Sequence, residues 1–311
     1  MIKKLVTMKK LILIFSMLAA LNGMAQQDAL FSQYMFNKLT VNPAYAGSRE
    51  VFSADLISRY QWVGFDGAPK TLSLSMHSPL KNEHMALGCY VYSDNIGATL
   101  DQGAQAVYAY RIILPKGKLS LGISAGMKYY NIDFSKVYVE DPDYFFYGQQ
   151  EKKIIPDANF GIYYYNNHLY AGLSSKQLLQ NEYALVNTSD GTSYSRLVRH
   201  FYGMAGLAIP VSDNVIFRPS TLVKFVKNAP WQIDLNASFL INDILWIGAT
   251  YRTDNTLCGM AELLVGKSLR IGYSYDYNLS PMRNYNSGSH EIRLGVDFDL
   301  LKVRMLTPRY F

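Results

Sequence analysis

Residues 119–129 have the sequence LSLGISAGMKY, and this stretch decides the fold class. Apolar side chains occupy every second position from Leu119 to Tyr129, and small or polar residues occupy the positions between them. A helix would space its apolar residues three or four apart, whereas strict alternation is typical of a strand with one apolar and one polar face. Residues 231–239 and 269–277 repeat the pattern, so the chain contains several such strands.

The same test applied along the whole chain predicts fourteen strands. Most of them reach the length of about 9–11 residues that a tilted strand needs to cross a bilayer, whereas strands average about 5–6 residues in soluble proteins. The sequence therefore predicts an all-β fold, an outer-membrane β-barrel of about 14 antiparallel strands that occupies residues 51–311. The predicted strands lie near 51–60, 70–78, 84–93, 103–113, 118–130, 157–165, 168–176, 197–209, 214–225, 230–241, 244–252, 256–265, 268–278 and 288–300.

The connections between these strands give an independent check. Every second connection is a short turn, whereas the longest irregular stretches, 131–156 and 177–196, both fall in the other set. Two connections of that other set, near 226–229 and 253–255, are short and do not discriminate. Outer-membrane barrels have short periplasmic turns and longer outer loops. The spacing thus predicts that both ends of the barrel sequence lie on the periplasmic side.

Residues 1–25 have the features of a secretory signal peptide. Four lysines precede the apolar run 11–21, and Gly23 and Ala25 are small residues suited to cleavage before Gln26. Removal of 1–25 leaves 26 basic and 24 acidic residues, so most of the formal charge of +6 disappears. We expect no nucleic-acid partner.

Aromatic residues make up 14% of the chain, with 25 tyrosines. Tyr and Trp are enriched at both membrane interfaces of a barrel, although aromatic residues could also fill the core of a soluble sheet. We expect a belt at strand ends formed by Tyr60, Tyr129, Tyr130, Tyr163, Tyr165, Trp231, Trp246, Tyr251 and Tyr277.

Charged residues of both signs lie on the polar faces of the predicted strands. We expect them to face the lumen, since charges that face lipid are costly. They would either brace the barrel through pairs across neighbouring strands or form an electrostatic lining that selects a passenger. The residues are Asp55, Arg59, Arg252, Arg270, Asp276, Glu291, Arg293 and Asp297.

Enzymatic motifs are weak. Residues 122–126 match the G-x-S-x-G pattern, but a nucleophile elbow needs a strand-to-helix turn and this pattern lies within a strand. The five histidines show no metal-ligand spacing. We therefore expect no catalytic residues, no cofactor, no bound metal and no enzymatic activity.

Residues 26–50 lack strand alternation although they carry several apolar side chains. Asn42-Pro43 is a turn signal, and apolar groups ahead of the first strand need a place to be buried. We expect this segment to pack in or against the periplasmic mouth and to narrow the pore. The residues concerned are Phe31, Tyr34, Phe36, Asn42, Pro43 and Tyr45.

Two stretches of this segment, QYMFN at 33–37 and VNPAYAGS at 41–48, resemble the N-terminal hallmark of the PorP/SprF family of type IX secretion membrane proteins. Shorter matches follow in order, including WIGATYR at 246–252 and the final PRYF at 308–311. The resemblance implies an outer-membrane barrel of Bacteroidetes-type bacteria. It also implies partners: secreted or surface-anchored cargo proteins such as gliding adhesins, and periplasmic and outer-membrane components of the secretion apparatus.

Three functions remain to be distinguished. The first is a non-enzymatic barrel that handles or anchors cargo, with a docking surface in loop 131–156, unless that loop folds over the barrel and buries its own rings. The second is a diffusion porin or nutrient channel, which requires an open lumen. The third is an outer-membrane lipid hydrolase, for which no Ser and His pair stands out. The candidate partner-binding residues are Asp141, Tyr144, Phe145, Phe146 and Tyr147.

Overall fold

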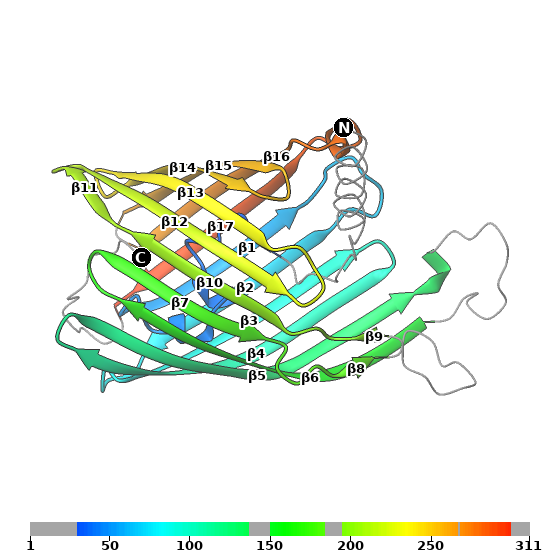
Figure 1. Cartoon of the computed structure of the whole chain (residues 1–311), viewed down its shortest axis with the longest axis horizontal. Helices are drawn as coiled ribbons and strands as arrows, with labels where there is room; N and C mark the ends of the chain where they lie inside the picture. Colours follow the sequence, from blue (N-terminus) through cyan, green and yellow to red (C-terminus); the bar gives the residue numbers. More distant parts are fainter. Residues whose placement is uncertain (1–29, 137–149, 184–194, 267, 300–311) are drawn as a thin grey trace, which may run out of the picture.

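The computed structural model describes residues 30–136, 150–183, 195–266 and 268–299. Their dominant feature is a sheet of antiparallel strands that closes on itself (Figure 1). The fourteen barrel strands are β1 (Phe52–Tyr60), β2 (Lys70–Pro79), β3 (Met85–Ile96), β4 (Thr99–Leu114), β5 (Gly117–Asp133), β6 (Gln150–Tyr165), β7 (Leu169–Lys176), β10 (His200–Leu207), β12 (Val215–Val226), β13 (Gln232–Ile241), β14 (Leu245–Arg252), β15 (Thr256–Val265), β16 (Leu269–Asn278) and β17 (Ser289–Phe298).

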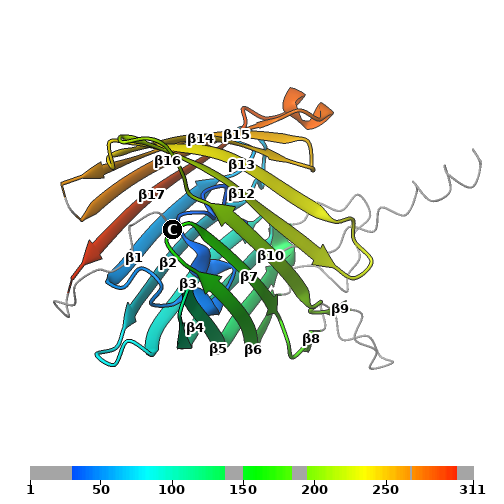
Figure 2. The same cartoon turned by 60° about the vertical axis from the view of Figure 1, so that its left-hand side comes forward.

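The first and last strands close the barrel. β1 pairs with β17 over its whole length, from Phe52 opposite Phe298 to Tyr60 opposite His290. On the far side β10 pairs with both β7 and β12. Each of the fourteen barrel strands thus pairs with a neighbour on both sides, which is the condition for a sheet to cross a bilayer. The predicted all-β barrel of 14 antiparallel strands is confirmed (Figure 2).

The predicted strand 197–209 is interrupted at Ala208, so that the short β11 (Ile209–Ser212) continues the hairpin to β12. A separate two-stranded ribbon, β8 (Glu182–Tyr183) and β9 (Ser195–Arg196), lies within the predicted loop 177–196. Four 3₁₀ turns complete the described elements: η1 (Lys38–Thr40), η2 (Pro43–Tyr45), η3 (Phe134–Lys136) and η4 (Pro281–Asn284).

The alternation in the sequence becomes a difference between the two faces of the barrel. In β5, Ile123 and Met127 expose 55% and 56% of their surface on the outside, whereas Ser124 between them exposes 5% inside. A sheet with an apolar outer face and a polar inner face matches the environment of an outer-membrane barrel.

Three strands are longer than the alternation predicted. β4, β5 and β6 have 16, 17 and 16 residues, whereas β14 has only 8. Their added residues lie at the long-loop end, where the chain leaves the bilayer and the outer face no longer has to be apolar. Backbone pairing continues there without an apolar pattern, so the pattern could not mark these strand ends.

Turn chemistry fits the predicted short connections. Asn242 and Asp243 both have positive φ, 53° and 55°, between β13 and β14. A two-residue hairpin turn of type I′ requires this conformation at both central positions, and Asn and Asp tolerate it best among non-glycine residues. These tight turns mark the periplasmic end of the barrel.

One part of the predicted aromatic belt is wrong. Tyr163, Tyr165 and Trp246 are buried inside the barrel, whereas Tyr60, Trp231, Tyr251 and Tyr277 are exposed outside. The three buried rings occupy the same alternate positions as the polar residues of their strands. Their side chains therefore point to the inner face of the barrel. No helix in the described ranges is both long enough and apolar enough to cross a membrane.

We predict that a charged side chain on the outer face destabilises the barrel more strongly the closer it lies to the middle of the bilayer. Ile123→Arg, near the middle of β5, should lower the free energy of unfolding by about 2–4 kcal/mol, whereas Leu114→Arg beside a periplasmic turn should cost about 0–1 kcal/mol. Both side chains are exposed on the outside. Urea unfolding of the barrel in phospholipid vesicles measures the difference, and equal costs would contradict the assignment of the membrane-facing surface.

Candidate functional site

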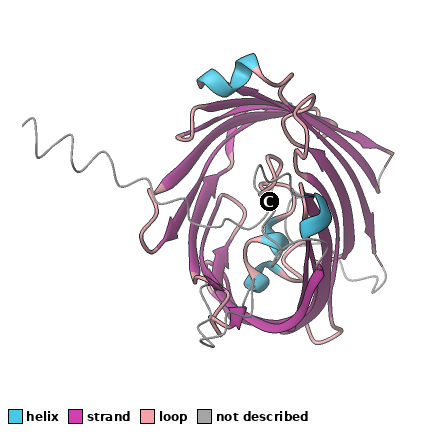
Figure 3. Ribbon diagram, turned by 90° about the vertical axis from the view of Figure 1, so that its right-hand side faces the viewer, coloured by secondary structure: helices cyan, strands magenta, loops and turns pink. Residues whose placement is uncertain are grey.

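The interior of the barrel is filled by part of its own N-terminal region. We call residues 30–50 the lumen segment; its short helical turns lie inside the ring of strands (Figure 3). Residues 31–48 are all buried. The segment begins beside side chains near the long-loop ends of β1 and β17, and Gly47 lies against the short-turn ends of β2 and β3. It therefore runs through the lumen from the outer half to the periplasmic rim.

Local sequence explains the compact course of the lumen segment. The side chain of Asn42 accepts a hydrogen bond from the backbone N–H of Ala44 at 2.9 Å, and Pro43 occupies the first position of η2. Asn is a preferred N-cap residue and Pro a preferred first residue of a helical turn. The predicted turn at Asn42-Pro43 is present, and it directs Tyr45 toward the barrel wall.

Aromatic rings anchor the segment to the wall. Phe36 packs edge-on against Trp246, with ring centroids 5.7 Å apart. Tyr45 packs edge-on against Tyr163 at 5.6 Å and against His77 at 5.4 Å. Trp246 and Tyr163, which the belt prediction misplaced, therefore form part of the wall surface on which the segment packs.

Burial of large apolar side chains is a main contribution to the stability of the segment inside the barrel. Seven large apolar side chains of the segment are buried, and each contributes about 1.5–3 kcal/mol, or about 10–20 kcal/mol in total as an upper estimate. Ordering the chain has an entropic cost of about 1–2 kcal/mol per residue, which opposes this gain, so apolar burial acts together with the hydrogen bonds and ion pairs of the segment. The seven are Phe31, Tyr34, Met35, Phe36, Leu39, Val41 and Tyr45.

Glycines in the wall let the backbone of the segment approach closely. A Cβ at Gly122 of β5 would overlap the backbone of Ala44, and a Cβ at Gly161 of β6 would overlap the side-chain oxygen of Asn42. The amide of Asn42 also donates to the strand carbonyls of Ile162 at 3.0 Å and Leu173 at 3.3 Å. These contacts form a glycine cradle on β5, β6 and β7.

A carboxylate holds the beginning of the segment. Glu291 accepts hydrogen bonds from two successive backbone N–H groups, those of Ser32 at 2.8 Å and Gln33 at 2.9 Å. Arg59 pairs with Glu291 at 3.0 Å and with Asp276 at 2.6 Å, and the Ser32 hydroxyl donates to Asp276 at 2.7 Å. We call this group the Glu291 clamp.

Other charges that were predicted to face the lumen also pair across strands. Arg293 on β17 contacts Asp55 on β1 and Glu262 on β15. Arg49 at the end of the segment pairs with Asp297 at 2.9 Å. Because each charge named here has an opposite partner in the barrel or in the segment, this arrangement favours bracing over a lining for a passenger.

Lys38 is a buried cation without a carboxylate among its described contacts. Its ammonium donates to the carbonyl of Met35 at 2.8 Å and lies 4.5 Å from the ring centre of Tyr170. Burial lowers the pKa of Lys38 well below its usual range, and the charge of Arg218 lowers it further. The ammonium also lies 5.2 Å from the ring centre of Tyr45, and such cation–π contacts partly offset the cost of removing it from water.

The structure brings together all six residues predicted for the mouth of the barrel, and they lie deeper than the mouth. It does not describe the five candidate partner-binding residues, Asp141 and Tyr144–Tyr147, which lie outside the described ranges. Sequence reasoning missed the role of Glu291 toward the segment; its inward parity was visible, but its partner lies 259 positions away. Among the described residues, no group of three or more His, Cys, Asp or Glu side chains is placed to hold a metal ion.

This geometry defines a class of protein: a transmembrane β-barrel of 14 strands whose lumen contains a segment of its own chain. The chain belongs to the PorP/SprF family, because the family model for type IX secretion system membrane proteins PorP/SprF matches residues 23–296. It is therefore an outer-membrane protein of the type IX secretion system. No curated protein matches this sequence.

Solved structures with a similar fold are outer-membrane barrels. The monoaromatic hydrocarbon channel CymD has 12% identity and a TM-score of 0.52, with coverage of 90% of this chain and 96% of its own. The toluene transporter TodX of P. putida has 9% identity and a TM-score of 0.49, with coverage of 83% and 93%. Omp33 of Acinetobacter baumannii has 7% identity and a TM-score of 0.47, with coverage of 81% and 99%. At such identities the likeness to CymD concerns the fold alone.

We predict that the glycine cradle is intolerant of side chains. Gly122→Ala forces the backbone of Ala44 to shift and should lower the free energy of unfolding by about 1–3 kcal/mol. Gly259→Ala on β15 is the matched control, because nothing lies within 4 Å of the added methyl group. Urea unfolding of both variants in detergent measures the effect. Equal stabilities would show that the segment does not press against β5.

We predict that Lys38 makes stability depend on pH. Its folded pKa lies below the unfolded value of about 10.4, so the unfolded chain binds more protons and wild-type stability rises with pH up to that value. The Lys38→Met variant lacks this pH-dependent contribution to stability. It should be more stable than wild type at neutral pH, and its advantage should shrink as pH rises to about 10.4. An advantage that stays constant with pH would contradict burial of Lys38.

Proposed function

We propose that this barrel is a closed, non-enzymatic component of the type IX secretion system that handles or anchors specific cargo proteins at the cell surface. The observation that carries the proposal is the lumen segment, which occupies the interior with buried apolar rings and paired charges. A cargo-handling barrel does not need a continuous water-filled path, whereas a diffusion porin does.

The filled lumen argues against the porin alternative on physical grounds. Porins keep a polar, water-filled interior, and small solutes cross it by diffusion. Here the polar groups of the wall bind the segment instead of water, as the contact between Glu291 and the amides of Ser32 and Gln33 illustrates. Opening a channel would require loss of these contacts together with the apolar burial of the segment.

The shape of the outer end also supports a docking role. β4, β5 and β6 exceed the length needed to span a bilayer by about six residues, or about 20 Å of strand. They form a wall on one side of the barrel. A projecting hairpin offers a surface to large partners without opening the lumen.

An enzymatic role has no support from the lumen chemistry. Ser124, the serine of the G-x-S-x-G pattern, is buried in β5 and bonded to Gln105 and Asn159 rather than to a histidine. A serine nucleophile needs an adjacent general base. We therefore retain no catalytic role for this site.

The proposal is tested at the outer loop. Replacing residues 144–147 with serine should reduce the amount of cargo at the cell surface by at least fivefold, because aromatic rings are strong contributors to protein interfaces. Surface cargo is measured by protease shaving of intact cells and mass spectrometry, and barrel assembly by heat-modifiable migration in gels.

Tyr285→Ser is the control, since Tyr285 lies in the connection between β16 and β17 and exposes 70% of its surface. Normal cargo display by the loop variant, with both variants assembled, would refute docking at this loop. Stepwise conductance of the wild-type protein in planar bilayers would instead support the porin alternative.

A further inference from the structure

The outer part of β6 has a free edge. β6 has 16 residues, whereas β7 has 8 and pairs only with residues 160–165 of β6. On its other side β6 pairs with β5 along its whole length. Residues 150–159 therefore have a neighbouring strand on the β5 side, but no strand in the described part of the chain lies on the other side. This free edge lies at the long-loop end, beyond the bilayer.

The chain that follows β7 turns away from β6. Gln177 has a positive φ of 58°, which is uncommon for a residue with a side chain and ends the extended course of the strand. The backbone N–H of Leu178 still donates to the carbonyl of Ala158 at 3.0 Å, and the side chain of Asn181 donates to the carbonyl of Pro156 at 2.6 Å. Beyond Pro156 the described residues donate no hydrogen bond to this side of β6.

These two hydrogen bonds show which backbone groups face the free edge. In an antiparallel strand the N–H and C=O groups of one residue point to the same side, and successive residues alternate between the two sides. The carbonyls of Pro156 and Ala158 point away from β5, so the backbone groups of Gln150, Lys152 and Ile154 point the same way. They form a row with a repeat of about 6.8 Å, and they have no hydrogen-bond partner within the described ranges.

Pro156 is a second indication that β6 is an edge strand at this level. Proline has no N–H group, and within sheets it is confined to edge strands, strand starts and bulges. At position 156 the missing N–H would point to the free side, so the pairing with β5 loses no hydrogen bond.

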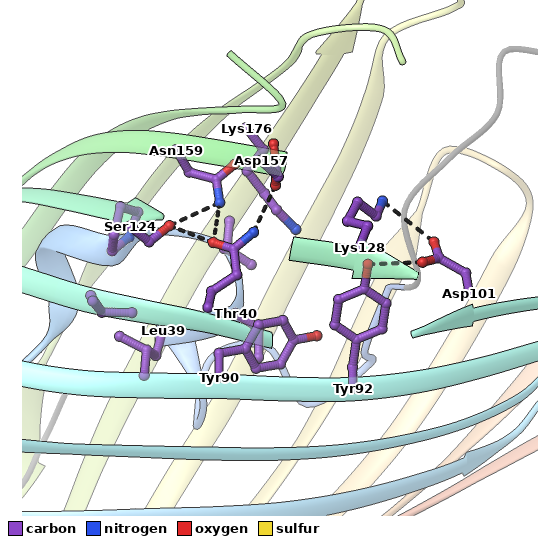
Figure 4. A pocket seen from close by; sticks show the side chains of 14 residues that line it. Leu39, Thr40, Tyr90, Tyr92, Asp101, Ser124, Lys128, Asp157, Asn159 and Lys176 are labelled. Atoms are coloured by element: carbon purple, nitrogen blue, oxygen red, sulfur yellow. Dashed lines mark hydrogen bonds and ion pairs between the residues drawn. The ribbon is translucent and has the colours of Figure 1, made fainter. Parts of the chain in front are cut away.

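Side-chain hydrogen bonds hold this part of β6 in position (Figure 4). Asp157 accepts a hydrogen bond from Gln105 of β4 at 2.6 Å. Asn159 donates to Gln105 at 2.5 Å and to Ser124 of β5 at 2.9 Å. The edge is therefore ordered before a partner arrives, and binding costs mainly the ordering of the partner.

The side chains beside the free edge are basic. Lys152 and Lys153 are exposed, and neither has a carboxylate partner among the residues that the structure describes. Pairing with a second copy of this edge would bring the lysines of the two copies together, and like charges opposite each other are destabilising. Lysines on an edge discourage such self-association. The same charges attract a strand that carries acidic side chains.

We propose that the free edge of β6, at residues 150–155, binds an extended, acidic strand of a partner polypeptide, which adds to the sheet outside the bilayer. The row of backbone donors and acceptors provides the affinity, and the two lysines provide selectivity for charge. The inference rests on the proposed function, because it names the class of partner segment for a cargo-handling barrel.

A synthetic peptide tests the free edge directly. The probe is a fluorescent peptide of about nine residues in which Thr and Glu alternate, and its binding to the purified full-length barrel in detergent is measured by fluorescence anisotropy at low salt. It should bind at least tenfold more tightly than the same peptide with every backbone nitrogen methylated, and at least tenfold more tightly than a peptide with Lys in place of Glu. Equal binding by either comparison peptide overturns the proposal. So does a lack of saturable binding, which is expected if another segment of this chain or a second copy occupies the edge.

A single substitution then locates the binding. Ile154→Pro removes one N–H of the free edge but no hydrogen bond to β5, so it should weaken binding of the acidic peptide at least fivefold. Ile154→Ala is the matched control, because it retains the N–H and should bind within about twofold of wild type. Equal binding by wild type and Ile154→Pro refutes the site.

A charge-reversal variant keeps the test decisive if Ile154→Pro does not assemble. Replacing Lys152 and Lys153 with Glu should weaken binding of the acidic peptide and strengthen binding of the Lys peptide. An unchanged preference for the acidic peptide in this variant contradicts the proposed site.

Failure of this inference is distinct from failure of the proposed function. Cargo display that depends on residues 144–147, without binding of the acidic peptide to wild type, rejects the edge and retains cargo handling. Peptide binding that Ile154→Pro abolishes, with normal cargo display in both that variant and the 144–147 variant, rejects cargo handling. The edge then serves a different partner strand.

Discussion

The carboxylate of Glu291 and the two backbone amides that it accepts, those of Ser32 and Gln33, determine where the lumen segment begins. If the buried carboxylate of Glu291 lost these donors and Arg59, the folded state would lose several kcal/mol of stability. The barrel thus supplies the acceptor for the segment, and the segment supplies donors for the barrel. Buried ion pairs are weak evidence for stability, but they specify position well. The clamp therefore fixes the start of the segment, and burial of apolar rings such as Phe36 and Tyr45 supplies the stabilising free energy.

The number of strands leaves room for such filling. A barrel of about eight strands is filled by its own side chains, whereas wider barrels enclose water or additional polypeptide. With fourteen strands this barrel needs more than side chains, and the lumen segment supplies it. β4, β5 and β6 extend beyond the filled lumen on one side of the barrel.

Alternation in the sequence was sufficient to predict the strand number, the turns and the inward direction of the lumen charges, because period-two patterning follows directly from the membrane environment. The belt prediction misplaced Tyr163 and Trp246 because it considered only their position near strand ends. Their parity along the strand would have placed both rings inside the barrel. The alternation also underestimated the lengths of β5 and β6, because the ends of these strands lie beyond the bilayer. The contact of Glu291 with Ser32 was beyond sequence reasoning, since it joins residues 259 positions apart through the three-dimensional register of the barrel.

We conclude that the lumen segment is an integral part of the folded barrel, held at Glu291 and in the glycine cradle. Hydrogen exchange of the full-length protein in detergent, followed by mass spectrometry of peptides that cover residues 30–48, tests this most directly. We expect these backbone amides to be protected for as long as those of β1 and β17, because local opening requires loss of the same buried contacts. Exchange within seconds, at the rate of the exposed connection between β16 and β17, would contradict it.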